Sequence, residues 1–388
     1  MNILLYDMGS YIQADLITYL TEMGHHCKNV LYPLSDLLED EYFEKYFTVH
    51  LQTGNYDCVI STNFQPLVAK ICYKNGIKYL AWSYDSPILH SYPEYYDYPT
   101  SFTFLFDRAE VEEFHNEGLS RVFHLPLAVN TRKFSSMTIT DSEKDVFSCD
   151  VSFVGTFYDS PLKGILSAQD DYTIGFLNAL TDAQFKFNNF SFLSDIIDDA
   201  LIDHINDMLV QNGVRYHTKR KADLDKASLL LCMNKQITRS ERIILLHLIN
   251  SFCQVRLFSN IQIEQLRDVP FMGPASYFSE MPKIFRCSKI SLNPTLRSIR
   301  SGIPLRALDI IGSGGFLLSN FQSEFADYFR PDLDLVLYEN IEDAIEKVKY
   351  YLSHDEERNK IQQNSYRIIT EKFTYPDRIA QMFKTAGL

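Results

Sequence analysis

Six basic side chains gather in one short stretch of this sequence. Residues 281–308 contain no carboxylate, although the 388-residue chain carries 50 acids and 37 bases. The six bases are Lys283, Arg286, Lys289, Arg297, Arg300 and Arg306. A local basic field inside an acidic protein predicts an anionic ligand at this place rather than general surface polarity.

The elements expected around these bases would present backbone N–H groups to an anion. Residues 290–292 are typical of a strand, and residues 305–311 of a short helix that follows Gly302 and Pro304. Gly314 and Gly315 then precede a second strand over 316–318. Loop N–H groups and a helix N-terminus beside arginines are how α/β proteins hold phosphates. The stretch therefore predicts a phosphate-binding site.

The run SGIPLRALDIIGSGGFLLSN, residues 301–320, resembles the donor-binding segment of the GT-B glycosyltransferases, most closely that of the CgeB-like (spore maturation protein) family. Residues 75–90 and 105–130 are similar to the N-terminal half of that family. The resemblance implies an α/β GT-B fold of two Rossmann-like domains, whose parallel sheets face each other across a cleft. It also implies that the C-terminal domain binds a nucleotide sugar and the N-terminal domain binds the acceptor.

Retaining GT-B enzymes carry two glutamates in this segment, separated by seven residues, and the second holds the ribose hydroxyls. The corresponding residues here are Ser301, which lacks a carboxylate, and Asp309, which is one methylene shorter than Glu. The resemblance therefore implies a ribose contact at Asp309.

We predict a donor site from this stretch, the resemblance and one earlier glycine. Its members are Gly155, Tyr277, Asn293, Arg297, Arg300, Gly302, Arg306, Asp309, Gly314 and Gly315. Arg306 is the first candidate for the diphosphate because it stands at the expected helix start, and Gly155 is included because it follows a strand. Each arginine has the alternative of an exposed charge or a structural ion pair, and Asp309 that of a carboxylate on a helix face. Tyr277 and Asn293 have the alternatives of a packed ring and a capping amide.

The catalytic base is expected in the N-terminal domain, at the carboxyl end of a strand. Asp85 in the run Trp82 to Pro87 fits that position, and Asp7 after the first strand is the second choice. Partial burial that raises the pKa of a carboxyl group toward the working pH would suit a general base. The alternative for Asp85 is a turn aspartate that stabilises the bend at Ser86 and Pro87.

No zinc-ligand spacing, nucleophile elbow or Walker loop occurs in the sequence. No metal-binding D-x-D motif is expected either, so we expect a metal-independent reaction without a cofactor, in which cationic side chains stabilise the departing diphosphate.

Strands that alternate with helices predict parallel, helix-covered sheets. We expect an N-terminal domain over 1–130, a polar linker over 131–148 and a C-terminal domain over 149–373. Residues 374–388 are expected to form a final helix with Thr374 as its N-cap, and the resemblance implies that it packs on the N-terminal domain. Within the C-terminal domain we expect a helix from Arg239 to Ile249 and a loop over 271–274.

The composition limits the partners and the location. A net charge of −13 argues against nucleic acid and anionic membranes as partners. The seven cysteines are scattered and form no C-x-x-C pair, which favours free thiols in a reducing compartment. The N-terminus lacks a signal-peptide pattern, and no run of 18 apolar residues occurs. These features predict a cytoplasmic protein without an integral membrane segment.

Together, these interpretations predict a hexosyltransferase-type glycosyltransferase that uses a UDP-, GDP- or dTDP-sugar. The acceptor stays open among proteins, polysaccharides and other cell-surface components. Two alternatives remain: a nucleotide-sugar 2-epimerase of the same fold, and a catalytically inactive protein that binds a nucleotide sugar.

Overall fold

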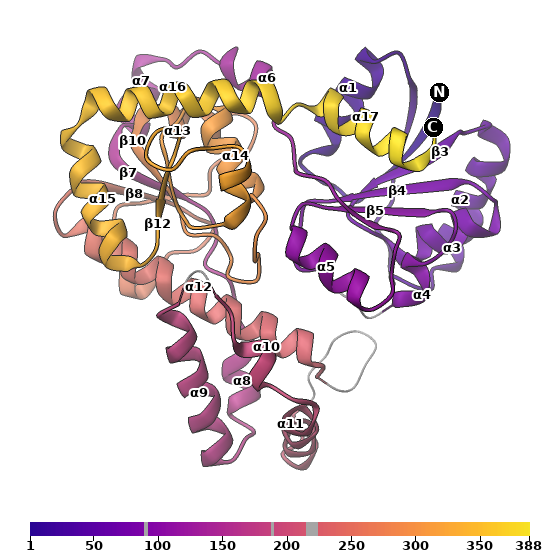
Figure 1. Cartoon of the computed structure of the whole chain (residues 1–388), viewed down its shortest axis with the longest axis horizontal. Coiled ribbons are helices and arrows are strands. Elements are labelled where there is room, and N and C mark those ends of the chain that lie inside the picture. Colours follow the sequence, from indigo (N-terminus) through magenta and orange to yellow (C-terminus); the bar gives the residue numbers. More distant parts are fainter. Residues whose placement is uncertain (89–91, 188–189, 215–223) are drawn as a thin grey trace. The chain divides into compact units, whose positions relative to one another are not determined.

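The computed structural model describes residues 1–88, 92–187, 190–214 and 224–388 (Figure 1). The chain forms two compact units. The first comprises Met1–Ser136, Arg300–Gly312 and Tyr366–Leu388, and the second comprises Met137–Ile299 and Ser313–Ser365.

The first unit is built on a six-stranded parallel sheet of order β2-β1-β3-β4-β5-β6. Its strands are β1 (Asn2–Asp7), β2 (His26–Leu31), β3 (Cys58–Thr62), β4 (Lys78–Ser83), β5 (Ser101–Leu105) and β6 (Val122–His124). Its helices are α1 (Gln13–Glu22), α2 (Glu41–Gly54), α3 (Pro66–Lys74), α4 (Pro93–Tyr96), α5 (Arg108–Asn116), α6 (Thr131–Ser135), α14 (Leu305–Gly312) and α17 (Tyr375–Ala386). Helix α16 (Asp355–Lys372) crosses the boundary between the units.

Central strands of the first sheet are buried on both faces, as expected when helices cover both sides of a parallel sheet. All five residues of β3 are buried. The C-terminal helix α17 packs against α1 and β4 of this unit. Its Tyr375 ring stacks on Tyr19 at a centroid distance of 5.0 Å and meets the Trp82 ring edge-on at 5.9 Å. The Thr374 hydroxyl caps α17 by accepting a hydrogen bond from the backbone N–H of Asp377.

The second unit contains another six-stranded parallel sheet, of order β12-β11-β10-β7-β8-β9. Its strands are β7 (Cys149–Val154), β8 (Val255–Phe258), β9 (Phe271–Gly273), β10 (Ser288–Asn293), β11 (Leu317–Asn320) and β12 (Val336–Tyr338). Its α-helices are α7 (Asp141–Phe147), α8 (Leu162–Leu166), α9 (Asp171–Phe185), α10 (Leu193–Ile196), α11 (Asp199–Gln211), α12 (Lys226–Asn250), α13 (Met281–Cys287) and α15 (Ile341–Ser353). Two 3₁₀ helices, η1 (Glu264–Leu266) and η2 (Ser323–Asp327), complete the unit.

A helical insertion, α8 to α11, separates β7 from β8. It has a hydrophobic cluster of its own, distinct from the cluster under the second sheet. Helix α12 contributes to both clusters: Leu229 and Met233 pack into the insertion, and Leu245 and Ile249 pack under the sheet. Figure 1 shows the insertion gathered along α12 on the side away from the strands.

The two parallel α/β sheets confirm the fold class expected from the sequence. Two local expectations about the second unit were wrong. The helix expected from Arg239 begins thirteen residues earlier, at Lys226, because its first half packs on the insertion. The loop expected over 271–274 contains the short edge strand β9, which pairs with β8. The polar stretch 131–148 holds the short helices α6 and α7.

All seven cysteines are free thiols. Within the described part of the chain, no helix combines the length and the apolar character that crossing a membrane requires.

Candidate functional site

The six bases of the basic stretch all contact protein groups, and most of these groups lie far away in the sequence. Lys283 pairs with Glu143, Lys289 with Asp150, Arg297 with Glu241, Arg300 with Glu113 and Arg306 with Asp309. Arg286 donates to the carbonyl oxygen of Met137 at 2.7 Å. The excess of positive charge along this sequence is therefore largely balanced in space.

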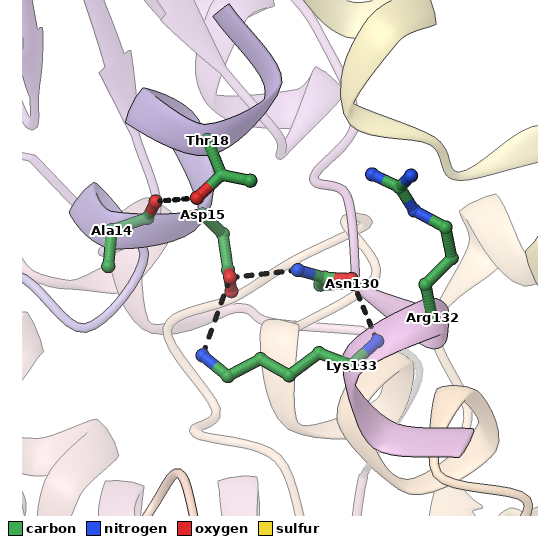
Figure 2. Close-up of a pocket in the computed structure, with 6 residues that line it drawn as sticks. All are labelled: Ala14, Asp15, Thr18, Asn130, Arg132 and Lys133. Carbon is green, nitrogen blue, oxygen red and sulfur yellow. Dashed lines mark hydrogen bonds and ion pairs between the residues drawn. The ribbon is translucent and has the colours of Figure 1, made fainter. Parts of the chain in front are cut away.

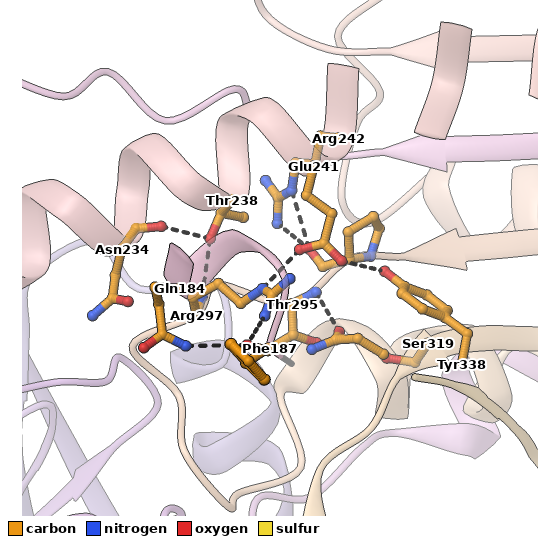
Figure 3. A network of polar contacts seen from close by, with 12 residues as sticks. Gln184, Phe187, Asn234, Thr238, Glu241, Arg242, Thr295, Arg297, Ser319 and Tyr338 are labelled. Carbon is orange, nitrogen blue, oxygen red and sulfur yellow. Dashed lines mark hydrogen bonds and ion pairs between the residues drawn. The ribbon is translucent and has the colours of Figure 1, made fainter. Parts of the chain in front are cut away.

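Arg297 belongs to a buried polar network in the second unit (Figure 3). Its Nε donates to Glu241 Oε2 at 2.8 Å, and the two side chains are only 6% and 1% exposed. The hydroxyl of Tyr338, at the end of β12, donates to the other Glu241 oxygen at 3.1 Å. Arg297 also donates to the carbonyl oxygen of Phe187 in the insertion at 3.0 Å. The structure thus gives Arg297 the structural ion pair that was the alternative to a phosphate contact.

Arg242, the neighbour of Glu241 on α12, links the loops that follow two central strands. Its guanidinium group donates to the carbonyl oxygen of Pro294 after β10 at 2.6 and 3.0 Å, and to that of Thr156 after β7. The same group lies over the rings of Phe153 and Tyr158. One buried cation therefore fixes the loop that begins at Gly155. Arg242 was not predicted as a site residue, although it directly follows Glu241 in the run Arg239 to Arg242.

Polar side chains also converge where β10 and β11 end. Asn293 Nδ2 donates to Ser319 Oγ at 3.0 Å and to Thr295 Oγ1 at 3.1 Å. The Thr295 backbone N–H donates to Asn320 Oδ1 at 2.7 Å. Asn320 Nδ2 is buried and finds no hydrogen-bond partner among the described residues. Ser319 and Asn320 were not predicted, but they stand at the carboxyl end of a parallel strand, where ligands of such sheets collect.

Residues 300–302 are held by Asp107, the buried N-cap of α5 in the first unit. Asp107 accepts from the backbone N–H groups of Arg300 at 2.6 Å and Ser301 at 3.2 Å, and from the Ser301 hydroxyl at 2.7 Å. The Arg300 side chain reaches Glu113 of the same helix at 2.8 Å. The serine at the position of the first family glutamate therefore serves to anchor the chain.

Gly302 is required by a close approach of the backbone. A Cβ atom built at this residue would lie 2.7 Å from the carbonyl oxygen of Phe106 and 2.8 Å from the Asp107 Cα. We expect Gly302→Ala to destabilise the protein by about 1–3 kcal/mol, because backbone atoms must move. Thermal unfolding followed by circular dichroism measures the effect. Gly164→Ala is the matched control, since a Cβ atom there meets nothing within 4 Å. An equal melting temperature for Gly302→Ala and the wild type would contradict the expectation.

Arg306 and Asp309 lie together on α14. Arg306 Nη1 is 3.5 Å from Asp309 Oδ2, and the Asp309 side chain is buried while that of Arg306 is half-buried. Gly314, with φ of +81°, makes the turn into β11 together with Gly315, and Gln362 donates to its carbonyl oxygen. The remaining donor candidate, Tyr277, meets the ring of Phe278 edge-on at 5.1 Å.

The predicted donor residues fall into both units. Arg300, Gly302, Arg306 and Asp309 belong to the first, whereas Gly155, Tyr277, Asn293, Arg297, Gly314 and Gly315 belong to the second.

The expectation that the sequence holds no D-x-D motif was wrong, because an Asp-x-Asp run with this spacing occurs at residues 332–334. Asp334 is buried and accepts from Arg330 Nε at 2.7 Å and Nη2 at 2.9 Å. This carboxylate serves a local ion pair. A second such run, at 223–225, begins outside the described residues.

The two base candidates stand at the carboxyl ends of strands in the first unit. Asp7 ends β1 and accepts from the backbone N–H of Gly9 at 2.7 Å and from Asn29 Nδ2 at 3.0 Å. Asp85 follows β4 and accepts from Asn63 Nδ2 at 2.7 Å. Asp85 is an exposed residue, but the atoms that surround its carboxyl group partly desolvate it and so raise its pKa. The hydrogen bond from Asn63 lowers the pKa.

A third carboxyl group near Asp85 was missed. Glu110 of α5 is 2% exposed, and burial raises its pKa to about 8. It accepts hydrogen bonds from the Ser86 hydroxyl at 2.7 Å and the Ile88 backbone N–H at 2.6 Å. The burial of Glu110 could not be predicted from the sequence, because the nearby acids of α5, Glu112 and Glu113, are exposed.

A pocket of about 400 Å³ opens beside α1 and α6 of the first unit (Figure 2). It is lined by Ala14, Asp15, Thr18, Asn130, Arg132 and Lys133. Asp15 accepts from Asn130 Nδ2 at 2.9 Å and is 3.4 Å from Lys133 Nζ. None of the predicted site residues lines this pocket.

Comparisons with known proteins agree with this architecture. A family model described as glycosyl transferase-like matches residues 243–384. No curated protein matches the chain.

Several solved structures share the fold. The chain is similar to a glycosyltransferase from Rickettsia africae ESF-5, with a TM-score of 0.58 and 10% identity over 99% of this chain and 97% of that one. Sucrose-phosphate synthase from Thermosynechococcus elongatus gives a TM-score of 0.58 and 9% identity over 99% and 98% of the two chains. Anabaena HepE in complex with UDP-glucose gives a TM-score of 0.52 and 11% identity over 100% and 99%. The chain therefore has the GT-B glycosyltransferase fold.

Proposed function

We propose that this protein is a metal-independent glycosyltransferase that moves a sugar from a nucleotide-sugar donor to an acceptor. The observation that carries the proposal is the GT-B fold over nearly the whole chain. The family match over 243–384 supports it, because that segment contains Arg306 and Asp309. UDP is the nucleotide of choice, since Anabaena HepE and T4 phage BGT, which share the fold, were solved with UDP-glucose. We further propose that the chain is of the CgeB-like type, on the sequence resemblance of its three segments.

On the donor side, Arg306 is proposed to stabilise the diphosphate and Asp309 to accept from the ribose hydroxyls. Negative charge develops on the diphosphate as its bond to the anomeric carbon breaks, and a fixed guanidinium group offsets that charge. In the second unit, the buried amide of Asn320 at the carboxyl end of β11 is a separate candidate hydrogen-bond donor. Arg297 supports the loop after β10 through its pair with Glu241.

On the acceptor side, Asp85 is proposed as the general base. It takes the proton from the acceptor hydroxyl while that oxygen forms its bond to the anomeric carbon, and the nucleoside diphosphate leaves with the electron pair of the broken bond. The raised pKa of Asp85 strengthens it as a base.

The first test is isothermal titration calorimetry of the purified protein with UDP, with and without EDTA. We expect binding that EDTA does not change and that Arg306→Ala weakens by about 10–100-fold, because a hydrogen-bonded charge contact to phosphate is lost. Arg267→Ala is the matched control, since Arg267 is an exposed arginine that pairs with the exposed Glu264.

Equal UDP affinity in Arg306→Ala and the wild type would remove Arg306 from the donor site. Binding of GDP or dTDP but not UDP would replace UDP in the proposal and still support a nucleotide-sugar donor. A product formed from the nucleotide sugar alone, with an inverted sugar carbon, would identify the 2-epimerase. Affinity without turnover of any donor would favour the binding protein, an outcome that the anchoring role of Ser301 allows.

A further inference from the structure

Glu110 contacts the two ends of the segment that directly follows Asp85. Its Oε2 accepts from the Ser86 hydroxyl at 2.7 Å, and its Oε1 accepts from the Ile88 backbone N–H at 2.6 Å. The carboxyl group is buried in the first turn of α5, a helix whose N-terminus is capped by Asp107. The segment after Asp85 is therefore tied to a regular element rather than to another loop.

Asp85 is held from the other side by Asn63, which follows β3. The Asn63 side-chain oxygen accepts from the backbone N–H groups of Tyr84 at 3.0 Å and Asp85 at 3.3 Å, and its amide donates to the Asp85 carboxylate at 2.7 Å. Asn63 itself adopts a left-handed backbone conformation, with φ of 66°. Asn63 thus orients the Asp85 carboxylate. These three contacts reach Tyr84 and Asp85, and the residues after Asp85 are held by Glu110.

We propose that Glu110 is a positioning residue for Asp85, which fixes the chain after this base so that its carboxylate keeps one place. The inference rests on the proposed function, because that function gives Asp85 its role. A buried carboxyl group that satisfies two donors at hydrogen-bond distance limits motion of the segment that carries them.

The surroundings of Glu110 suit a neutral carboxyl group. Burial and the nearby Asp107 raise its pKa to about 8, whereas its two hydrogen bonds and Arg300 act in the opposite direction. Among the described residues, the buried Tyr96 hydroxyl group also interacts with it. A neutral carboxyl group keeps both contacts if its O–H donates to Ser86 and its carbonyl oxygen accepts from Ile88. A glutamine side chain can make the same two contacts.

The test compares Glu110→Ala, Glu110→Gln and Glu112→Ala in the full chain at pH 7. Glu112 is the matched control because it lies on the same helix and is exposed. Hydrogen exchange read by mass spectrometry reports on residues 84–88, and steady-state kinetics with the nucleotide sugar reports kcat and KM. Folding of each variant is checked by far-ultraviolet circular dichroism.

We expect exchange at residues 84–88 to be about 10-fold faster in Glu110→Ala, because the Ile88 N–H loses its acceptor. We expect kcat to fall by about 10–100-fold with the donor KM unchanged, since a displaced base costs rate rather than affinity. Glu110→Gln and Glu112→Ala should match the wild type in both measurements. If Glu110→Ala does not fold, Ser86→Ala removes one of the two contacts and should lower kcat in the same way.

Unchanged exchange in Glu110→Ala would overturn the inference and leave the proposed function standing. Faster exchange with an unchanged kcat would also overturn it, because greater motion of residues 84–88 would then not lower the rate of the reaction. A wild-type protein that turns over no nucleotide sugar would overturn the proposed function, and the role of Glu110 with it, whatever the exchange.

Discussion

Replacing Arg297 with alanine lowers the free energy of unfolding by about 3–5 kcal/mol, the range expected when one partner of a buried ion pair is removed. Glu241 would stay behind in a site where it is only 1% exposed, with the hydroxyl of Tyr338 as a neutral donor. The Phe187 carbonyl oxygen would lose its Arg297 donor as well. Urea denaturation followed by far-ultraviolet circular dichroism measures the change.

Lys289→Ala is the matched control for this result. Lys289 lies in the same basic stretch and pairs with Asp150 at 2.8 Å, but both side chains are accessible, at 48% and 27%. Its loss should cost less than about 1 kcal/mol, because water replaces the partner. A stable Arg297→Ala protein that had lost its UDP affinity would contradict the structural role and restore the phosphate contact predicted from the sequence.

Replacing Asp85 with asparagine should lower kcat by about 10²–10⁴-fold, the usual contribution of a general base. UDP affinity should not change, because the proposed role of Asp85 lies with the acceptor. The pKa of this carboxyl group is raised above its ordinary value, so the wild-type rate should rise as the pH increases through that pKa and the base loses its proton. A pH series of kcat for the wild type and for Asp85→Asn tests both points.

Asp7→Asn is the comparison for Asp85→Asn. Asp7 also ends a strand of the first sheet, but it accepts hydrogen bonds from the backbone N–H of Gly9 in its own turn and from Asn29 on the neighbouring strand β2. We expect a change of less than about 3-fold in kcat, within the range of a structural hydrogen bond. A large loss of kcat in Asp7→Asn together with a normal kcat in Asp85→Asn would identify Asp7, and not Asp85, as the general base.

The central strands could be predicted from the sequence because both of their faces are covered. Runs such as Ile3 to Tyr6 and Tyr79 to Trp82 are apolar at every position, which marks a strand in the middle of a parallel sheet. Strands β2 and β9 are edge strands, and a loop was expected in place of β9. Most side chains of β2 are exposed or partly exposed, and β9 is only three residues long, so neither has the apolar signature.

The site was harder to predict, because charge along the chain is a poor guide to charge in space. The basic stretch lacks carboxylates of its own, but Glu113, Glu143, Asp150 and Glu241 reach it from elements far away in the sequence. Arg306 was predicted from its place at the expected helix start and Asp309 from the family resemblance, and both lie on α14. Asp107 and Glu110 could not, since nothing local separates these buried acids from the exposed acids of α5.

Helix α12 runs for 25 residues, about 37 Å, and it belongs to two hydrophobic clusters at once. Its first half is embedded in the helical insertion, and its second half carries Glu241 and Arg242, which hold the loops after β10 and β7. Helix α12 therefore connects the helical insertion rigidly to these loops. A displacement of α8–α11 would be transmitted along one continuous backbone to the loops that follow β10 and β7.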